Sequence, residues 1–238
     1  MSLDERIEDL QCQGLKIVQN KKLYTFTSDS VILANYAKTK SKDVVVEIGA
    51  GSGVVSILLQ AKNQLNKIYA FEIQPEMQDL CEKNIKLNNL EEKIVLIKDD
   101  VNNFKAHIAP ASVDVVISNP PYFKKTNFKQ DKVKQIAKEE VCLTVQQLVE
   151  VSAKMLKDGG SFWCCFPAER SCELISLCQN NALAVKEMFF TENGKGEVKL
   201  FVCKAVKNGK AGTRVLPNLT TNETGGNYLE KLHTKNIK

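Results

Sequence analysis

The chain has few residues of the kinds that hold metals. It contains two histidines, His107 and His233, and none of its eight cysteines belongs to a C-x-x-C pair. Zinc sites need closely spaced cysteine or histidine ligands, and disulfide frameworks are typical of small secreted domains. The sequence therefore favours reduced cysteines that pack as small apolar residues, and it predicts no metal site.

Long hydrophobic runs are also missing. No run of about 18 apolar residues is present, which excludes an ordinary transmembrane helix. The first residues, MSLDERIEDLQ, are acidic and polar, unlike a secretory signal. We therefore expect a cytoplasmic protein with no membrane partner, and the sequence makes no prediction of oligomeric state.

Neither sign of charge dominates. Lysine and arginine number 33 against 28 acidic residues, and this mild excess is compatible with a nucleic-acid partner without requiring one. The lysines are concentrated in residues 124–138 and 195–210, which we expect to lie in exposed loops.

From residue 43 onward, short runs rich in valine and isoleucine alternate with segments of helical periodicity. Strands are expected at 44–48, 67–73, 93–98, 112–118, 161–166, 182–190 and 197–206, and helices at 53–63, 75–90, 144–160 and 168–181. The third of these helices is expected to begin at a cap, Thr144, and to stop at Gly159. The last two strands flank TENGKG, which is typical of a hairpin turn.

The strand runs lack strict alternation, which indicates a parallel sheet covered on both faces. The sequence therefore predicts an α/β fold, a doubly wound, Rossmann-like sheet of seven strands that closes in a C-terminal antiparallel hairpin. The expected organisation is an N-terminal extension at 1–40, the core domain at 41–206 and a polar tail at 207–238.

Three glycines, Gly49, Gly51 and Gly53, lie between the first strand and its helix, where backbone can approach a ligand closely. The dinucleotide fingerprint G-x-G-x-x-G fails because Val54 occupies its sixth position. Instead, Glu47 precedes the glycines, and a carboxylate there repels a pyrophosphate but suits an ammonium group. The predicted ligand carries an ammonium or a sulfonium and no phosphate.

Two further acids follow the next two strands. Glu72 ends the second strand at the position that binds ribose hydroxyls in doubly wound folds, and Asp100 follows the third strand, where it would accept from an adenine amino group. Three acids after three successive strands indicate a ligand site at the carboxyl edge of the sheet.

The fourth strand of the parallel series runs into Asn119, Pro120, Pro121 and Tyr122. Prolines cannot extend a sheet, so this stretch predicts a stiff loop, with Asn119 facing both the predicted cationic ligand and a substrate. The Asn119 side-chain oxygen and the Pro120 carbonyl would accept from a substrate amino group, and Tyr122 would stack on a base. These residues are the predicted catalytic ones.

The segments EIGAGSG, FEIQPE and KDDV resemble the first motifs of class I S-adenosylmethionine-dependent methyltransferases, which implies S-adenosyl-L-methionine as the cofactor. The tetrapeptide NPPY is similar to the motif of methyltransferases that act on adenine N6, guanine N2 or glutamine amides. It therefore identifies an attacking nitrogen and not a substrate.

YTFTSDSVILANYA, NPPYFKK and GEVKLFVCKAVKNGKAGTRVLPNL together resemble bacterial tRNA1(Val) (adenine(37)-N6)-methyltransferases. This resemblance implies methylation of an adenosine in tRNA and places Asp29 beside the cofactor. The alternatives are a guanine-N2 methyltransferase of ribosomal RNA, a protein glutamine methyltransferase, and an RNA-binding protein that has lost catalysis.

The expected partner is tRNA, bound through two sets of basic residues. The first set follows the catalytic loop, namely Lys124, Lys125, Lys129 and Lys132. The second set, expected to make a more distant contact, comprises Lys195, Lys207, Lys210 and Arg214.

Overall fold

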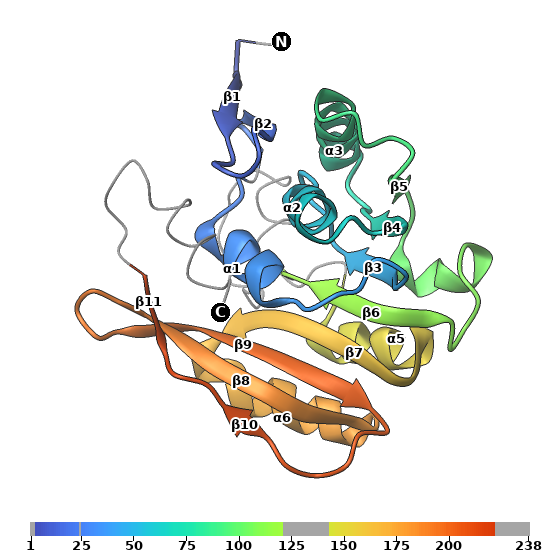
Figure 1. Cartoon of the computed structure of the whole chain (residues 1–238), viewed down its shortest axis with the longest axis vertical. Coiled ribbons are helices and arrows are strands. Elements are labelled where there is room, and N and C mark those ends of the chain that lie inside the picture. Colours follow the sequence, from blue (N-terminus) through green and yellow to red (C-terminus); the bar gives the residue numbers. More distant parts are fainter. Residues whose placement is uncertain (1–2, 24, 121–142, 222–238) are drawn as a thin grey trace.

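The structure, a computed structural model, describes residues 3–23, 25–120 and 143–221. A central sheet has the strand order β10-β8-β9-β7-β6-β3-β4-β5, with β11 also paired to β8 (Figure 1). Its strands are β3 (Val44–Ile48), β4 (Lys67–Phe71), β5 (Ile94–Ile97), β6 (Val113–Ser118), β7 (Leu156–Pro167), β8 (Leu183–Asn193), β9 (Val198–Lys207), β10 (Arg214–Val215) and β11 (Leu219–Thr221).

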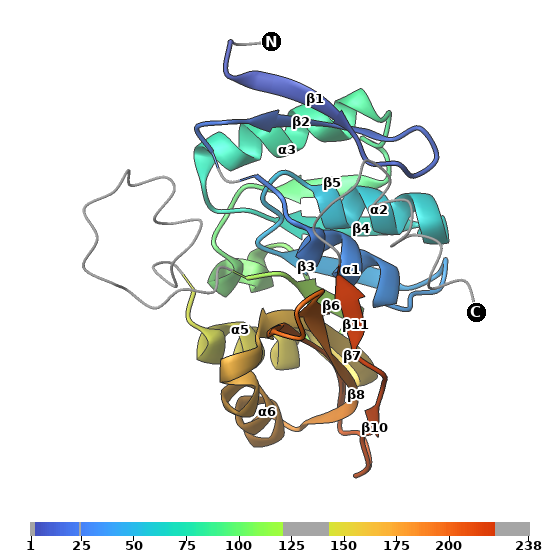
Figure 2. The same cartoon turned by 90° about the vertical axis from the view of Figure 1, so that its left-hand side faces the viewer.

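The helices are α1 (Ser28–Tyr36), α2 (Val54–Asn63), α3 (Pro75–Leu87), α5 (Val145–Met155) and α6 (Ser171–Asn180), with 3-10 turns η1 (Val101–Ala106) and η2 (Ala168–Arg170). Near the N-terminus, β1 (Glu5–Asp9) and β2 (Lys16–Asn20) form a separate antiparallel pair, here called the N-terminal ribbon. The ribbon lies along α3 (Figure 2).

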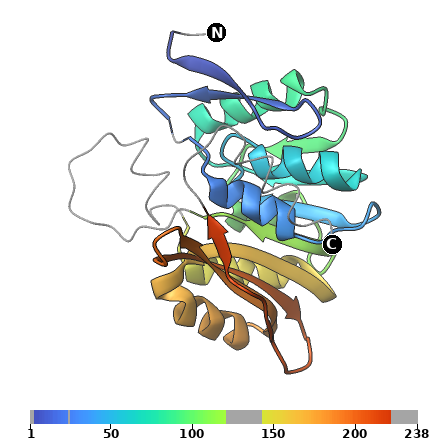
Figure 3. The same ribbon diagram turned by 60° about the vertical axis from the view of Figure 1, so that its left-hand side comes forward.

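The predicted doubly wound sheet is confirmed. Strands β3 to β7 pair in parallel, and β9 runs antiparallel between β7 and β8. The tail adds what the sequence did not reveal, because β10 and β11 both pair in parallel with β8. In Figure 3 the tail strand β11, drawn in red, ends beside α1, and its Leu219 shares a buried cluster with that helix.

The junction of α5 and β7 differs from the expectation in one respect. Thr144 caps α5 as predicted, since its hydroxyl accepts from the Gln147 N–H in a capping box. The helix, however, ends at Met155, and β7 follows directly from Leu156. Gly159 therefore does not stop the helix. It lies inside β7 with a φ of +78°, a left-handed conformation that favours glycine.

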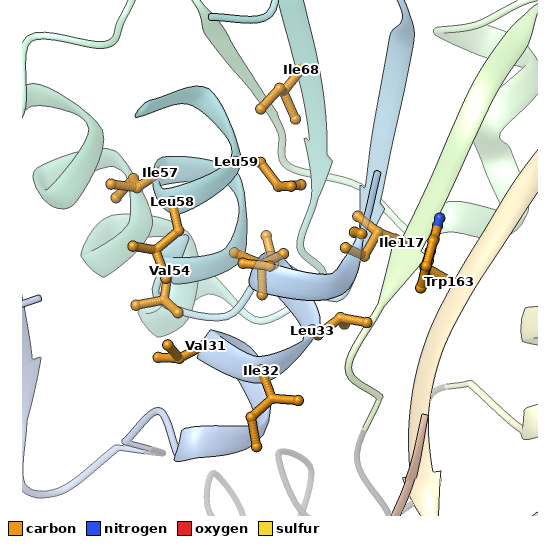
Figure 4. Close-up of a cluster of buried hydrophobic side chains, with 14 of the residues drawn as sticks. Val31, Ile32, Leu33, Val54, Ile57, Leu58, Leu59, Ile68, Ile117 and Trp163 are labelled. Atoms are coloured by element: carbon orange, nitrogen blue, oxygen red, sulfur yellow. The ribbon is translucent and has the colours of Figure 1, made fainter. Parts of the chain in front are cut away.

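The two faces of the sheet bury separate hydrophobic clusters. One face packs against α1, α2 and α3, and the other against η1, α5 and α6. Figure 4 shows the first cluster, in which Val31, Ile32 and Leu33 of α1 lie close to the apolar side chains of α2. Helix α1 is thus an integral part of the core, although it precedes the first parallel strand.

Two kinds of feature are absent from the described residues. None of the helices there has the length and apolar character to cross a membrane. The same part of the chain holds no group of three or more histidine, cysteine or acidic side chains placed to ligate a metal.

Candidate active site

The turn between β3 and α2 is built on three left-handed glycines. Gly49, Gly51 and Gly53 have φ values of +73°, +57° and +84°. A Cβ on Gly49 would meet no heavy atom within 4 Å, whereas one on Gly53 would lie 2.9 Å from Cys81 Sγ. Gly53 therefore permits close packing of α2 on α3, and Gly49 leaves space on the turn that a ligand can enter.

This turn is held by its neighbours before any ligand binds. The N–H groups of Gly49 and Ala50 both donate to the Phe71 carbonyl, at 3.0 and 2.9 Å. The Gly51 N–H donates to the Glu72 carboxylate at 2.7 Å. Since these contacts come from the end of β4, the glycine turn and the second predicted acid form one hydrogen-bonded unit.

Glu47 is only 2% exposed and lies under the first turn of α2. Its carboxylate accepts from the Ser56 N–H at 3.0 Å and from the Ser56 hydroxyl. Burial, with a smaller contribution from the charge of Glu72, raises the pKa of Glu47 to about 8 against the lowering effect of the two Ser56 bonds. The structure thus places Glu47 at the base of the glycine turn, and its contact with a ligand ammonium stays a prediction.

This raised pKa has a consequence for stability. A carboxyl group with a higher pKa in the folded chain binds its proton more tightly there, so the free energy of unfolding decreases as pH rises from its ordinary pKa of 4.5 to about 8. Glu47→Gln removes this titration and leaves an oxygen that accepts from Ser56. We expect the variant to gain at least about 1 kcal/mol relative to the wild type between pH 5 and pH 8.

Urea unfolding at several pH values measures this difference. Glu91→Gln, the same change at an exposed position, is the matched control and should give no such gain. Parallel stability profiles of wild type and Glu47→Gln between pH 5 and pH 8 would contradict the assignment of a raised pKa to Glu47.

Glu72 is also buried, at 4% exposure. Besides Gly51, its carboxylate accepts from the Gln74 N–H at 2.9 Å. Burial raises its pKa, and backbone N–H donors partly offset that effect. Each carboxylate oxygen has two lone-pair sites, so Glu72 retains capacity for a ligand hydroxyl. Ile73 follows it with 38% exposure, an apolar surface beside a buried acid.

Asp100 caps the 3-10 turn η1, which follows β5. Its carboxylate accepts from the Asn102 N–H at 2.8 Å and from the Asn102 side-chain amide at 2.9 Å. Glu47 near the end of β3, Glu72 after β4 and Asp100 after β5 therefore lie at the ends of adjacent strands, at the carboxyl edge of the sheet. Asp100 has an oxygen acceptor at this edge that suits an amino group.

The C-terminal end of β6 and the first turn of α1 meet at Asn119. The Ser118 hydroxyl donates to the Ile48 carbonyl at 2.8 Å, which ties β6 to β3 just before the glycine turn. The Asn119 side-chain N–H donates to the Ser30 hydroxyl at 3.0 Å. Asp29, the neighbour of Ser30, is half-buried, and burial raises its pKa. The fold thus brings Asp29 and Asn119 to one region.

Several predicted residues lie outside the described part of the chain. Of the tetrapeptide, Asn119 and the buried Pro120 are described. The residues outside it are Pro121, Tyr122, Lys124, Lys125, Lys129 and Lys132.

The topology separates the second set of basic residues. Lys195 lies in the turn between β8 and β9, at the carboxyl edge where Asn119 also lies. Lys207 ends β9 at the opposite edge and donates to the Leu156 carbonyl at 2.9 Å, and Lys210 follows it. Arg214 forms an ion pair of 2.9 Å with Glu187.

Two polar residues that contact the candidate site were not predicted from the sequence. Ser30, which holds the Asn119 amide, carries no signal because serine is common throughout helices and loops. Asn84 of α3 donates to the Ser52 carbonyl inside the glycine turn at 2.9 Å. An asparagine in a helix interior is unfavourable, and that was a signal that its side chain has a specific partner.

The fold and this site define a class. A doubly wound sheet that includes the antiparallel strand β9, a left-handed glycine turn and acids at successive strand ends fits a methyltransferase that uses S-adenosyl-L-methionine. The buried acids and the open face of Gly49 suit a cationic nucleoside without phosphates. The profile of the methyltransferase small domain matches residues 25–182, and the chain belongs to that family. S-adenosyl-L-methionine is accordingly its cofactor.

Individual proteins agree with this assignment. The tRNA1(Val) (adenine(37)-N6)-methyltransferase of Tolumonas auensis is 26% identical over 202 residues, which cover 84% of this chain and 83% of the relative. A predicted O-methyltransferase of Agrobacterium tumefaciens has a similar fold, with a TM-score of 0.68, 15% identity and coverage of 86% of this chain and 95% of its own. Methanocaldococcus jannaschii TYW2, solved with AdoMet, gives a TM-score of 0.60 and 19% identity, with 86% of each chain covered.

Proposed function

We propose that the protein transfers the methyl group of S-adenosyl-L-methionine to N6 of an adenosine in tRNA, namely adenosine 37 of the anticodon loop. The observation that carries the proposal is the position of Asn119, at the end of β6 and next to the glycine turn that follows β3. The name of the Tolumonas relative supports the choice of base and of RNA.

The residues around Asn119 suit an amino-group acceptor. An exocyclic amine on adenine is a weak nucleophile because its lone pair is delocalised into the ring. Two oxygen acceptors on its N–H groups would draw that lone pair out of the plane, and the Asn119 side chain and the Pro120 carbonyl provide them. The Asn119 nitrogen donates to the Ser30 hydroxyl, so the oxygen is the atom of this amide that would accept from the substrate amine.

Bound S-adenosyl-L-methionine supplies an electrophilic methyl group on a sulfonium, and the chain has to hold amine and methyl in line. Positioning of this kind contributes most of the rate when little proton transfer is needed. Tyr122, which follows the two prolines, would stack on the base and fix its plane. The N6 proton becomes acidic once the nitrogen is alkylated, so the mechanism needs no strong general base.

The acids at the carboxyl edge would hold the cofactor. Glu72 would accept from the ribose hydroxyls, and Ile73 would pack on a face of the adenine. Asp100 would accept from the adenine amino group. Glu47 would act on the cofactor's ammonium group from the base of the turn, and Asp29 would lie beside it at the start of α1.

RNA binding should depend on the lysines that follow the catalytic loop. An N6 atom in a duplex is engaged in pairing, so a loop adenosine minimises the cost of exposing the base. Phosphate contacts beside that base would release counterions and make binding salt-dependent. We assign these contacts to Lys124, Lys125, Lys129 and Lys132. We add Lys195, which lies at the carboxyl edge of the sheet as Asn119 does.

Replacing these four lysines by glutamine should weaken tRNA binding at low salt and flatten its dependence on salt concentration, while S-adenosyl-L-methionine binding stays intact. Filter binding across a salt series measures both quantities. The matched control neutralises four exposed lysines at the edge of the sheet opposite Asn119, namely Lys42, Lys67, Lys93 and Lys154. Equal losses in the two quadruple variants would contradict the assigned surface.

The proposed activity can be tested in cells. Nucleosides of tRNA from a strain without the gene should lack the N6-methyladenosine found in the parent strain, and the wild-type gene should restore it. Unchanged N6-methyladenosine in the deletion strain would contradict the proposal.

A further inference from the structure

Asn84 connects three segments of the protein that are far apart in sequence. Its side chain is fully buried on α3, with 0% exposure. The amide N–H group donates to the Ser52 carbonyl at 2.9 Å and to the Val18 carbonyl at 3.1 Å, and the amide oxygen accepts from the Val18 N–H at 2.6 Å. One side chain thus bonds both to the glycine turn and to the N-terminal ribbon.

A second asparagine, Asn88, repeats half of this pattern one helical turn later. Its amide accepts from the Lys16 N–H at 3.0 Å and donates to the Lys16 carbonyl at 2.8 Å. Lys16 and Val18 are two residues apart, so both direct their backbone groups to the same edge of β2. The two side-chain amides therefore pair with β2 as a neighbouring strand would, while β1 pairs with its other edge.

The glycine turn needs a constraint of this kind. Glycines lose more conformational freedom than other residues when they become ordered, and three of them in five residues make a turn that is costly to fix. The peptide between Ser52 and Gly53 is held at both ends, since the Ser52 carbonyl accepts from Asn84 and the Gly53 N–H donates to the Ala50 carbonyl at 2.8 Å. Asn84 thus provides an anchor for the turn from outside it.

Apolar contacts connect the same parts. Val18 of the ribbon packs in a small buried cluster with Met77 of α3. The Met77 Cε atom lies 3.7 Å from the position that a Cβ on Gly51 would take. The ribbon thus reaches the glycine turn by a second route, through Met77.

We propose that Asn84 is a positioning residue for the cofactor, and that through it the N-terminal ribbon, residues 5–20, is part of the cofactor site. This inference rests on the proposed function only in that the glycine turn binds S-adenosyl-L-methionine. It predicts that order in the turn and order in the ribbon are coupled, because both share the Asn84 amide.

Asn84→Ala tests the proposal, with Asn88→Ala as the matched control. Both variants remove an amide that holds the ribbon, but the Asn88 bonds go to the ribbon and to the backbone of α3 and not to Ser52. Calorimetry should give a Kd for S-adenosyl-L-methionine about tenfold or more higher for Asn84→Ala and within about twofold of wild type for Asn88→Ala. In turnover assays, Asn84→Ala should raise the KM for the cofactor and leave kcat nearly unchanged.

Equal cofactor affinity in wild type and a folded Asn84→Ala would overturn the proposal. A wild-type protein that binds no S-adenosyl-L-methionine would overturn the proposed function instead, so the two failures are distinguishable.

Hydrogen exchange of the wild-type protein gives a second test that does not depend on the folding of a variant. Saturating S-adenosyl-L-methionine should slow exchange of the Val18 amide, which donates to Asn84. The control is the Leu216 amide, which donates to the Met188 carbonyl at 2.8 Å near the β8 end of the sheet, away from β4 and β5. Protection of Val18 no greater than that of Leu216 would overturn the coupling.

Discussion

Replacing Asn119 by alanine is expected to lower turnover about a hundredfold or more, the scale of losing one preorganised polar group in an active site. Affinity for S-adenosyl-L-methionine should stay nearly unchanged, because the Asn119 oxygen is proposed to accept from the target amine. Single-turnover assays and calorimetry measure the two quantities. The outcome of interest is a loss in kcat without a matching loss in cofactor binding.

Two further variants make this result specific. Ser30→Ala should lower kcat by less, since it removes the hydroxyl that orients the amide and keeps the amide itself. Asn208→Ala changes an exposed asparagine at the opposite edge of the sheet and should have no effect. Wild-type turnover in Asn119→Ala would show that the acceptor role is wrong.

Glu72→Ala is expected to weaken S-adenosyl-L-methionine binding by about 1–3 kcal/mol, the cost of leaving buried hydrogen-bonding groups without a partner. The loss has two sources. The ribose hydroxyls lose their acceptor, and the Gly51 N–H loses the carboxylate that anchors the turn. Calorimetry with S-adenosyl-L-methionine measures the change.

Glu72→Gln separates these sources, because glutamine keeps an oxygen for Gly51 and loses the charge. We expect its affinity to lie between those of wild type and Glu72→Ala. If Glu72→Ala bound the cofactor as tightly as wild type, the role of this acid in the site would be refuted.

Much of the fold was predictable because it depends on local patterns. Strands β3, β5 and β6 are short runs rich in valine and isoleucine, and the chain alternates its parallel strands with helices of clear apolar periodicity. The tail strands were not predictable. Arg214–Val215 and Leu219–Thr221 are too short to give a strand pattern, and they form because the edge of β8 offers backbone partners.

The candidate site divides in the same way. Glu72, Asp100 and the three glycines follow strands, so their place at the carboxyl edge could be predicted from chain order alone. The Ser30–Asn119 bond joins residues 89 positions apart, and no spacing in the sequence predicts such a pair.

The burial of Glu47 was also not predictable, although its partner Ser56 is close in sequence. The charge of Glu47 and its place before the glycines predicted a partner for a ligand ammonium group. In the fold, the first turn of α2 covers Glu47, and the Ser56 N–H donates to its carboxylate. Burial, which decides its pKa, depends on this packing and not on the residue type.

The proposed function is tested most directly by offering the purified protein labelled S-adenosyl-L-methionine together with total tRNA, total ribosomal RNA and a glutamine-bearing release-factor peptide. After digestion, mass spectrometry identifies the labelled product. We predict label in tRNA as N6-methyladenosine. Label in the peptide or as N2-methylguanosine, with none as N6-methyladenosine in tRNA, would contradict the proposal.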